Sequence, residues 1–392
     1  MTASYIVSAA RTPIGKFLGS LSSLSAGEIG AVAVKAALER AGLDSGSVDE
    51  VIMGNVLSAG QGQAPARQAA LKAGLPSSVA AVTVNKVCGS GLKAVMLADQ
   101  AIRAGDARAI IAGGQESMSR APYLMQGARE GFKFGDKKVV DSMVHDGLWC
   151  AFEDQHMGVS ADYIADKCEV SREDQDAFAA DSHQKAAAAI EAGKFEAEMA
   201  AVTVPGRKGD TIVTADEGPR ADSTAEGLGK LRAAFSKEGS VTAGNASQLS
   251  DGAAAVLVVD EATAAEIDSP VKARIVATAT SGVDPKDIFI APVSAMEMVL
   301  AKAGLTVGDI DLFELNEAFA AQSLACMRQL DVPAEKTNVN GGSIALGHPI
   351  GASGARVLVT LLHALADRGL KRGLTSLCLG GGNAVAMIVE RG

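Results

Sequence analysis

The sequence predicts an α/β protein made of two related halves. The segment Ala37–Asn55 reads ALERAGLDSGSVDEVIMGN, and Val299–Asn316 repeats its pattern as VLAKAGLTVGDIDLFELN. In each copy a helix ends at a glycine, a short turn follows, and an aspartate precedes a β-rich strand. A glycine-rich turn, an alanine-rich helix and a closing strand then follow, with the closing strands at Ile110–Gly114 and Thr375–Gly382. This repetition predicts two α/β halves, each built around a largely buried sheet.

The composition is that of a globular protein with a large core. The chain has 392 residues, of which 48% are hydrophobic, so it accommodates two or three domain-sized units that need no disulfide or metal. Five cysteines without regular spacing favour a reducing compartment. The first residues contain neither a basic region nor a long apolar run, so we expect no signal peptide and a cytoplasmic location.

Charge and hydropathy argue against two kinds of partner. No apolar stretch approaches the roughly 20 residues that cross a bilayer, so we expect no membrane association. The net charge of −10 argues against a nucleic-acid partner. An anionic small ligand is still compatible with this charge, because local arginine and lysine side chains can bind phosphate inside an acidic protein.

The region between the two halves has a different character. Methionine, aromatic and charged residues cluster there in long irregular segments, and such segments in a compact protein are usually functional. Its one clear helix has Ser171 as the N-cap and ends near Gly193. We expect the region to bind substrate, with a surface insertion as the alternative. We expect an N-terminal half at 1–118, completed by about 249–268. A loop domain at 119–248 and a C-terminal half at 269–392 make up the rest.

A lone histidine stands in the glycine-rich run Asn340–Gly354, NGGSIALGHPIGASG. His348 has glycines and Pro349 as neighbours, where no packing role requires a titratable ring. Glycine lets the backbone turn sharply and approach a ligand. We therefore expect the imidazole to be presented rather than buried, as an acid or base.

Two cysteines lie in similar turns. Cys88 precedes a helix that begins near Gly91, and the dipole and free N–H groups of such a helix lower a thiol pKa and stabilise an oxyanion. Cys378 ends a strand-like segment, and Asn316 follows the strand Asp311–Leu315, at the strand end where α/β sheets bind ligands. Together with the histidine, these residues predict a nucleophile, its base and a second acid or base. A small buried structural cysteine is the alternative for each thiol.

The spacing of residues argues against a metal site and against nucleotide-binding loops. The chain has no CxxC and no histidine pair four residues apart, which argues against a zinc site. Gly342–Gly347 has the glycine spacing of a phosphate loop but lacks its lysine, and no GxGxxG opens a helix after the first strand. We expect no metal and no cofactor.

The motifs taken together resemble the thiolase family over the whole chain. NKVCGSGLKAV around Cys88, NEAFA from Asn316, NGGSIALGHPIGASG around His348 and CLGGGN from Cys378 occur in the order and spacing of that family. The resemblance is closest to the acetoacetyl-CoA thiolases. It implies a thiolase-like five-layered αβαβα core made of two duplicated halves, with an inserted loop domain that covers the active site.

The resemblance also implies catalytic roles. Cys88 would be the nucleophile that carries the acyl group, and His348 would accept its proton. Cys378 would remove a Cα proton from acetyl-CoA in condensation or return it in thiolysis. His348 and a water held by Asn316 would meet the enolate oxygen, and the N–H groups of Cys88 and Gly380 would meet the thioester oxyanion.

In the loop domain and around it, the resemblance implies a groove for CoA. The matching positions are Leu148, His156, Met157, Arg220, Leu231, Phe235, Ala243, Ser247, Leu249, Ile288, Ala318 and Phe319. Gly227 stands where many bacterial biosynthetic members have a serine, and Ile288-Phe289 replaces their Met-Gly pair. The second pair shapes the acyl pocket, so it bears on the chain length that is accepted.

The implied activity is an acyltransferase that interconverts two acetyl-CoA with acetoacetyl-CoA and CoA through an acyl-cysteine, in a homotetramer. Longer 3-ketoacyl-CoA substrates of fatty-acid degradation are one alternative. A β-ketoacyl synthase is a more distant one. Outside enzymes, the alternative is a non-catalytic acyl-CoA-binding protein on the same scaffold.

Overall fold

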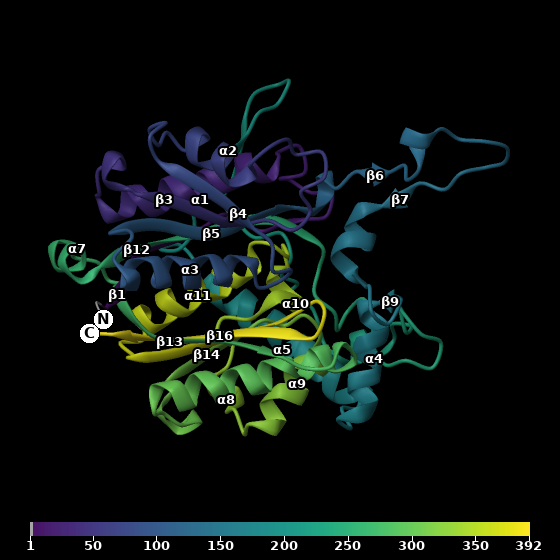
Figure 1. The fold of residues 1–392 in the computed structure, drawn as a ribbon. Coiled ribbons are helices and arrows are strands. Elements are labelled where there is room, and N and C mark those ends of the chain that lie inside the picture. The colour runs from purple at the N-terminus through teal and green to yellow at the C-terminus, as the bar shows by residue number, and fades with distance from the viewer. Residues whose placement is uncertain (1–2) are drawn as a thin grey trace.

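The structure is a computed structural model that describes residues 3–392, and two sheets alternate in it with three layers of helices (Figure 1). In spatial order the first sheet contains β1 (Ser4–Arg11), β12 (Ser250–Asp260), β5 (Ala109–Ser117), β3 (Glu50–Gly54) and β4 (Ala80–Val84). The second contains β13 (Ala273–Gly282), β16 (Asn383–Arg391), β15 (Arg372–Leu379) and β14 (Leu312–Leu315). Within residues 3–392, the two sheets join only where Tyr5 and Ile6 of β1 pair with Arg274 and Ala273 of β13.

Helices cover both outer faces and fill the space between the sheets. The outer face of the first sheet carries α1 (Ala26–Ala41) and α2 (Pro65–Lys72), and that of the second carries α8 (Ala291–Ala303) and α9 (Ala320–Gln329). Between the sheets lie α3 (Ser90–Ala104) and α11 (Ser353–Asp367), whose apolar side chains form the central core with both sheets. This arrangement confirms the predicted αβαβα fold (Figure 1).

The duplication is visible in matching hydrogen bonds. Helices α1 and α8 end at Gly42 and Gly304, both left-handed, with φ of 64° and 67°, a conformation that glycine adopts without strain. Asp49 then accepts hydrogen bonds from two consecutive backbone N–H groups just before β5, at 2.7 and 2.9 Å. Asp311 does the same before β15, at 3.0 and 2.8 Å. Each aspartate thereby links the start of its own strand to the neighbouring parallel strand.

The region 119–248 contains more regular structure than its sequence indicates. Helix α5 (Arg172–Glu191) begins after Ser171, whose hydroxyl accepts from the Asp174 N–H at 3.1 Å, as predicted. The expectation of a single helix was wrong, because α4 (Met157–Lys167) precedes it. Its N-cap is His156, which accepts from the Gly158 N–H through Nδ1 at 3.0 Å. Histidine is not among the usual N-cap residues, so the start of this helix gave no signal.

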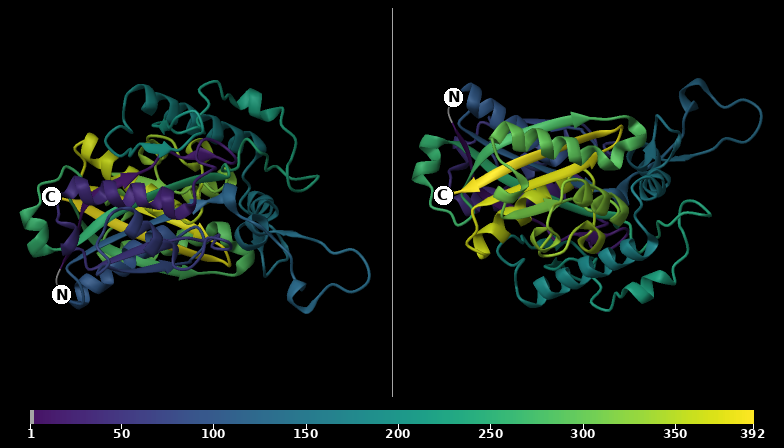
Figure 2. Two further views of the ribbon diagram at one scale, coloured as in Figure 1. Left: turned by 90° about the horizontal axis from the view of Figure 1, so that it is seen from above. Right: turned by 90° about the horizontal axis from the view of Figure 1, so that it is seen from below.

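The remaining short elements lie mainly in the same region. They are β6 (Tyr123–Leu124), β7 (Val140–Asp141), the π-helix η4 (Met143–Leu148), β8 (Trp149–Cys150), β9 (Gln155–His156), β10 (Val202–Val204), β11 (Thr211–Val213) and α6 (Ala225–Gly229). Outside it lie β2 (Gly15–Lys16), which pairs with β12, and the short helices α7 (Glu261–Glu266) and α10 (Ser343–Leu346). The chain between β6 and β7 forms an arm that projects from the body in all three views (Figures 1 and 2).

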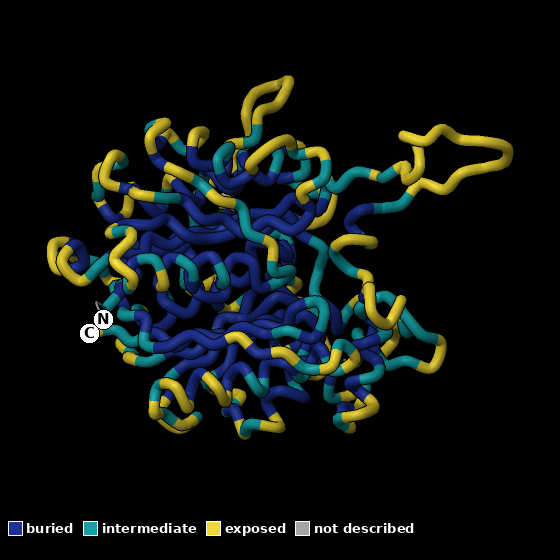
Figure 3. The backbone as a smooth tube through the Cα atoms, viewed as in Figure 1, coloured by how far each residue is buried: buried dark blue, intermediate teal, exposed yellow. Residues whose placement is uncertain are grey.

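Burial separates the layered body from this arm. The sheets and the two central helices are buried, whereas the arm is exposed along its length (Figure 3). In the part of the chain that the structure describes, we find no helix with the length and apolar character needed to span a membrane.

Candidate active site

A strained turn presents Cys88 at the start of α3. Val87 has φ 47°, a left-handed conformation that costs a β-branched residue about 1–3 kcal/mol. Two side chains hold the turn. Asn85 accepts from the Val87 N–H at 3.0 Å, and the Ser90 hydroxyl accepts from the Lys86 N–H at 2.8 Å and donates to the Val87 carbonyl at 2.6 Å. The predicted helix near Gly91 begins at Ser90, so the position of Cys88 before a helix is confirmed.

The pKa of the Cys88 thiol differs from the expectation. The residue is partly exposed at the cavity, but the surrounding protein removes much of the water from the thiol, and this burial raises the thiol pKa to about 12. The buried carboxylate of Glu116 acts in the same direction. The helix N-terminus was expected to lower the thiol pKa. Loss of water around the sulfur raises this pKa and is the larger effect here. Cys88 is therefore a protonated thiol that needs a base.

Alkylation of Cys88 by iodoacetamide tests this protonation state. Because the thiolate fraction grows with pH up to the thiol pKa, the alkylation rate is expected to rise steadily from about pH 7 to about pH 10. Peptide mass spectrometry separates Cys88 from the partly exposed Cys168, which serves as the reference thiol. A rate that is already at its plateau near pH 7 would instead show a preformed thiolate.

His348 is buried, contrary to expectation, with only 7% of its surface exposed. Burial and the charge of Arg356 lower its pKa to about 3, so the ring is neutral at physiological pH. Its Nδ1 lies 2.5 Å from the Ser353 hydroxyl, which donates its only hydrogen to the Pro349 carbonyl at 2.9 Å. The hydroxyl must therefore accept from Nδ1–H, which leaves Nε2 unprotonated and able to act as a base.

The glycines around His348 serve packing more than ligand approach. A Cβ on Gly354 would collide with the backbone of Leu92 in α3, and one on Gly91 would lie 2.7 Å from the Ala355 nitrogen in α11. The two central helices therefore touch backbone to backbone near their N-termini. This close approach brings the Cys88 turn of one half beside the His348 turn of the other. Only Gly347, at φ 113°, needs glycine for its backbone conformation at the histidine itself.

Asn316 and Cys378 reach the same place from the second sheet. Asn316 follows β14, as predicted, and its Nδ2 lies 3.5 Å from Nε2 of His348. Cys378 lies near the end of β15 (Arg372–Leu379), as predicted. Burial, with a contribution from the neighbouring thiol of Cys88, raises the Cys378 pKa well above its ordinary value. The turn after it packs on the other cysteine loop, since a Cβ on Gly380 would lie 3.2 Å from Val87.

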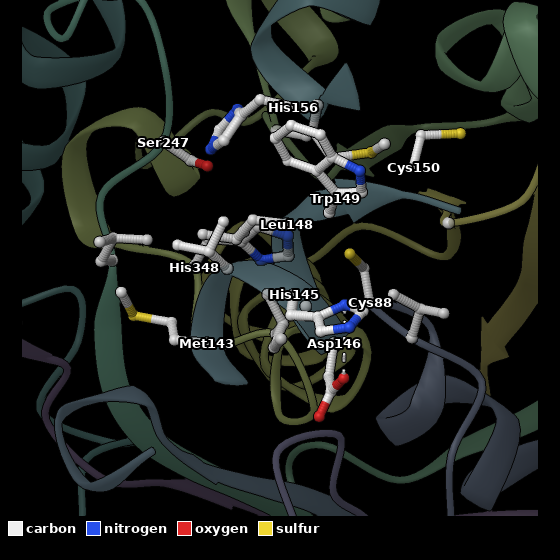
Figure 4. Close-up of a pocket in the computed structure, with 18 of the residues that line it drawn as sticks. Cys88, Met143, His145, Asp146, Leu148, Trp149, Cys150, His156, Ser247 and His348 are labelled. Atoms are coloured by element: carbon white, nitrogen blue, oxygen red, sulfur yellow. Dashed lines mark ion pairs between the residues drawn. The ribbon is translucent and has the colours of Figure 1, made fainter. Parts of the chain in front are cut away.

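A single cavity of about 1340 Å³ contains most of the predicted residues (Figure 4). In Figure 4 the Cys88 thiol and the His348 ring lie in it with Ser247 and His156. The predicted residues that line it are Cys88, Leu148, His156, Met157, Phe235, Ala243, Ser247, Leu249, Ile288, Ala318, Phe319, His348, Cys378 and Gly380. Asn316 is not among the lining residues but contacts His348, which is one of them. Arg220 is exposed and Leu231 packs near Gly244, so the structure brings neither into the lining.

Several lining residues had no signal in the sequence. The π-helix Met143–Leu148 forms one wall, and its His145 and Asp146 approach each other at 4.0 Å (Figure 4). A second wall is a series of rings from positions that the resemblance did indicate: Phe319 stands edge-on to both Phe289 and Phe235, at 5.1 and 6.2 Å between centroids. The residues missed are those of the π-helix, such as Met143, His145 and Asp146, because no local pattern indicates that this segment folds against the cavity. Among the residues described, 3–392, no group of three His, Cys, Asp or Glu side chains is placed to hold a metal ion.

Comparison with known proteins agrees with this geometry. The family model "Thiolase, N-terminal domain" matches residues 4–262, and "Thiolase, C-terminal domain" matches residues 269–391. The chain belongs to the thiolase family. In this thiolase Cys88 comes from the N-terminal domain, and Asn316, His348 and Cys378 come from the C-terminal one. The cavity that these residues share therefore forms where the two domains meet.

Relatives of this thiolase align along its full length. An acetyl-CoA acetyltransferase from Pseudomonas aeruginosa is 58% identical over 387 residues, which covers 98% of each chain. One from Escherichia coli is 56% identical over 387 residues, again with 98% of each chain covered. The crystal structure of the acetyl-CoA acetyltransferase from Bacillus anthracis superimposes with a TM-score of 0.97, at 41% identity, and covers 100% of this chain and 99% of that one.

Proposed function

We propose that this thiolase interconverts two acetyl-CoA with acetoacetyl-CoA and CoA through an acetyl group carried on Cys88. The observation that carries the proposal is the convergence of two thiols, Cys88 and Cys378, and a neutral imidazole, His348, in one cavity. The relatives named acetyl-CoA acetyltransferase support the substrates. We further propose that CoA occupies the cavity beside His156, Phe235 and Ser247. No other cofactor enters the reaction.

In the thiolysis direction, Nε2 of His348 accepts the thiol proton of Cys88 as its sulfur attacks C3 of acetoacetyl-CoA. The oxyanion lies at the backbone N–H groups of Cys88 and Gly380. Across residues 3–392 neither of these groups donates to another backbone carbonyl, so both are free for this role. The C2–C3 bond then breaks, and its electron pair forms the enolate of acetyl-CoA.

Cys378 donates its proton to C2 of that enolate, and acetyl-CoA leaves. The thiol of CoA then gives its proton to the Cys378 thiolate and attacks the acetyl group, while the Cys88 sulfur recovers its proton from His348. The raised pKa of Cys378 suits both directions. The thiol is protonated when an acid is needed, and its thiolate is a strong enough base for a weakly acidic Cα–H in condensation.

The apolar end of the cavity supports a short acyl group. Ile288 and Phe289 are both only 2% exposed, and Phe289 is held by its edge-to-face contact with Phe319. Such tightly packed side chains leave little room for a longer chain.

Steady-state thiolysis by the purified protein tests the proposal. With free CoA as co-substrate, we expect kcat/KM for acetoacetyl-CoA to exceed that for a 3-ketoacyl-CoA six or more carbons longer by at least about tenfold. A preference for the longer substrate would assign the protein to fatty-acid degradation. Ile288→Ala, which has a smaller side chain at the acyl pocket, would then be the first variant to examine. No turnover of either substrate would favour the non-catalytic acyl-CoA-binding protein.

We also propose that the protein is a homotetramer. The arm between β6 and β7 supports self-association, because it leaves the body and exposes large apolar side chains. They are Tyr123, Met125, Phe132, Phe134 and Val139. Such a patch on a projecting segment is typical of a surface that another chain covers.

A further inference from the structure

A chain of buried hydrogen bonds runs from Arg356 to the catalytic histidine. Nη2 of Arg356 donates to the Ser343 hydroxyl at 2.8 Å, and that hydroxyl donates to Oδ1 of Asn316 at 2.7 Å. On the other side of the amide, Nδ2 of Asn316 faces Nε2 of His348 at 3.5 Å. The Arg356, Ser343 and Asn316 residues are at most 1% exposed.

The direction of this chain follows from the chemistry of its members. A guanidinium has donors only, so Arg356 makes Ser343 an acceptor on one side. The hydroxyl has a single hydrogen, which must then go to Asn316 and can meet only the oxygen of its amide. The Asn316 nitrogen is therefore forced toward His348, where it donates.

Without this constraint the amide has two orientations of nearly the same shape. In the flipped one, Oδ1 would face the unprotonated Nε2 of His348, and two acceptors would oppose each other. The flipped amide would also present no N–H to the side of the cavity where the enolate oxygen forms.

Two secondary-structure elements place the chain and the catalytic residues together. Arg356 lies three residues after Ser353 on α11, so the two side chains share one face of the helix. From this face Ser353 contacts His348, and Arg356 contacts Ser343. Glu314 lies two residues before Asn316 on the same side of β14, and its carboxylate is 3.7 Å from Nη1 of Arg356. Both side chains of this pair are 2% exposed. Glu314 therefore lies beside the guanidinium without a hydrogen bond to it, and Nη2 of Arg356 is the nitrogen that reaches Ser343.

We propose that Arg356 and Ser343 are positioning residues that select the Asn316 amide orientation needed for the enolate step. This inference rests on the proposed acetoacetyl-CoA reaction. The inference predicts different effects on the two half-reactions. Ser343 hydrogen-bonds to Asn316, which serves the enolate step, whereas Ser353 hydrogen-bonds to His348, the base for Cys88.

Ser343→Ala is the informative variant, since it removes the hydroxyl that links Arg356 to Asn316 and keeps both of those side chains. Formation of the acetyl-enzyme is measured by exchange of labelled CoA into acetyl-CoA, and the enolate step by exchange of the acetyl Cα hydrogens with D₂O. We expect Cα exchange and thiolysis to fall about tenfold to about 10²-fold, as for a displaced oxyanion donor, while CoA exchange changes less than about twofold. Ser353→Ala is expected to slow both half-reactions. Ser8→Ala, at a buried serine of β1 that does not line the cavity, controls for the loss of a buried hydroxyl.

A second measurement does not depend on turnover. The chain has five histidines, so ¹⁵N NMR resolves the His348 ring, and Ser343→Ala is expected to shift its Nε2 resonance while Nδ1 stays protonated. An unchanged Nε2 signal, or equal losses in both half-reactions of Ser343→Ala, would overturn the inference. Failure of the wild-type protein to use acetoacetyl-CoA would refute the proposed function, and the Nε2 shift would still decide whether the chain orients Asn316.

Discussion

Cys88→Ala is expected to abolish acyl transfer. The alanine has no sulfur to hold the acetyl group, and no other thiol takes its place, because the neighbouring Cys378 is buried and its raised pKa keeps it protonated. Removing a nucleophile that acts together with its base costs at least about 10⁴-fold in turnover. Steady-state thiolysis of acetoacetyl-CoA measures the loss. Mass spectrometry of the protein after incubation with acetyl-CoA shows whether an acetyl group is attached.

Cys168→Ala is the matched control for this experiment. Cys168 is a partly exposed thiol at the end of α4, and it does not contribute to the cavity lining. We expect the control to keep wild-type thiolysis and the acetylated peptide that contains Cys88. Substantial thiolysis by Cys88→Ala, or acetylation at another cysteine in the wild type, would refute the role of Cys88.

Cys378→Ala is expected to slow proton transfer at Cα and to leave acetylation of Cys88 intact. The variant retains Cys88 and His348, so acetyl-CoA should still acetylate Cys88 and labelled CoA should still exchange. Without the second thiol, proton transfer at Cα loses its acid and base, which costs about 10²–10⁴-fold. The measurement compares CoA exchange with deuterium incorporation into acetyl-CoA and with thiolysis of acetoacetyl-CoA.

Cys326→Ala provides the control for removing a buried thiol near this position. Cys326 donates to the Phe289 carbonyl at 3.2 Å and is fully buried beside Cys378, but it does not line the cavity. Its loss is expected to leave both exchange reactions within about twofold of wild type. If Cys378→Ala slowed CoA exchange as much as deuterium exchange, Cys378 would not be the specific acid and base at Cα.

Local signals in the sequence were sufficient to predict the two halves and to single out candidate catalytic residues. The helix ends at Gly42 and Gly304 and the cap at Ser171 follow from the conformational preferences of single residues, which act over a few neighbours. The repeated aspartates Asp49 and Asp311 marked the same turn in each half. Cys88 and His348 stood out because of the glycines around them. The family resemblance then joined these separate motifs into one reaction.

The amino-acid sequence was therefore enough to predict the two-half α/β architecture and to name the candidate residues of the proposed reaction. The environment of those residues became visible only in the folded protein. The contact of Gly91 with α11 brings Cys88 beside His348, burial makes the thiol a weaker acid and the imidazole a weaker base, and Ser343 and Arg356 orient Asn316. Water exclusion and hydrogen-bond direction depend on groups that lie far apart along the chain and meet only after folding, so no local pattern encodes them.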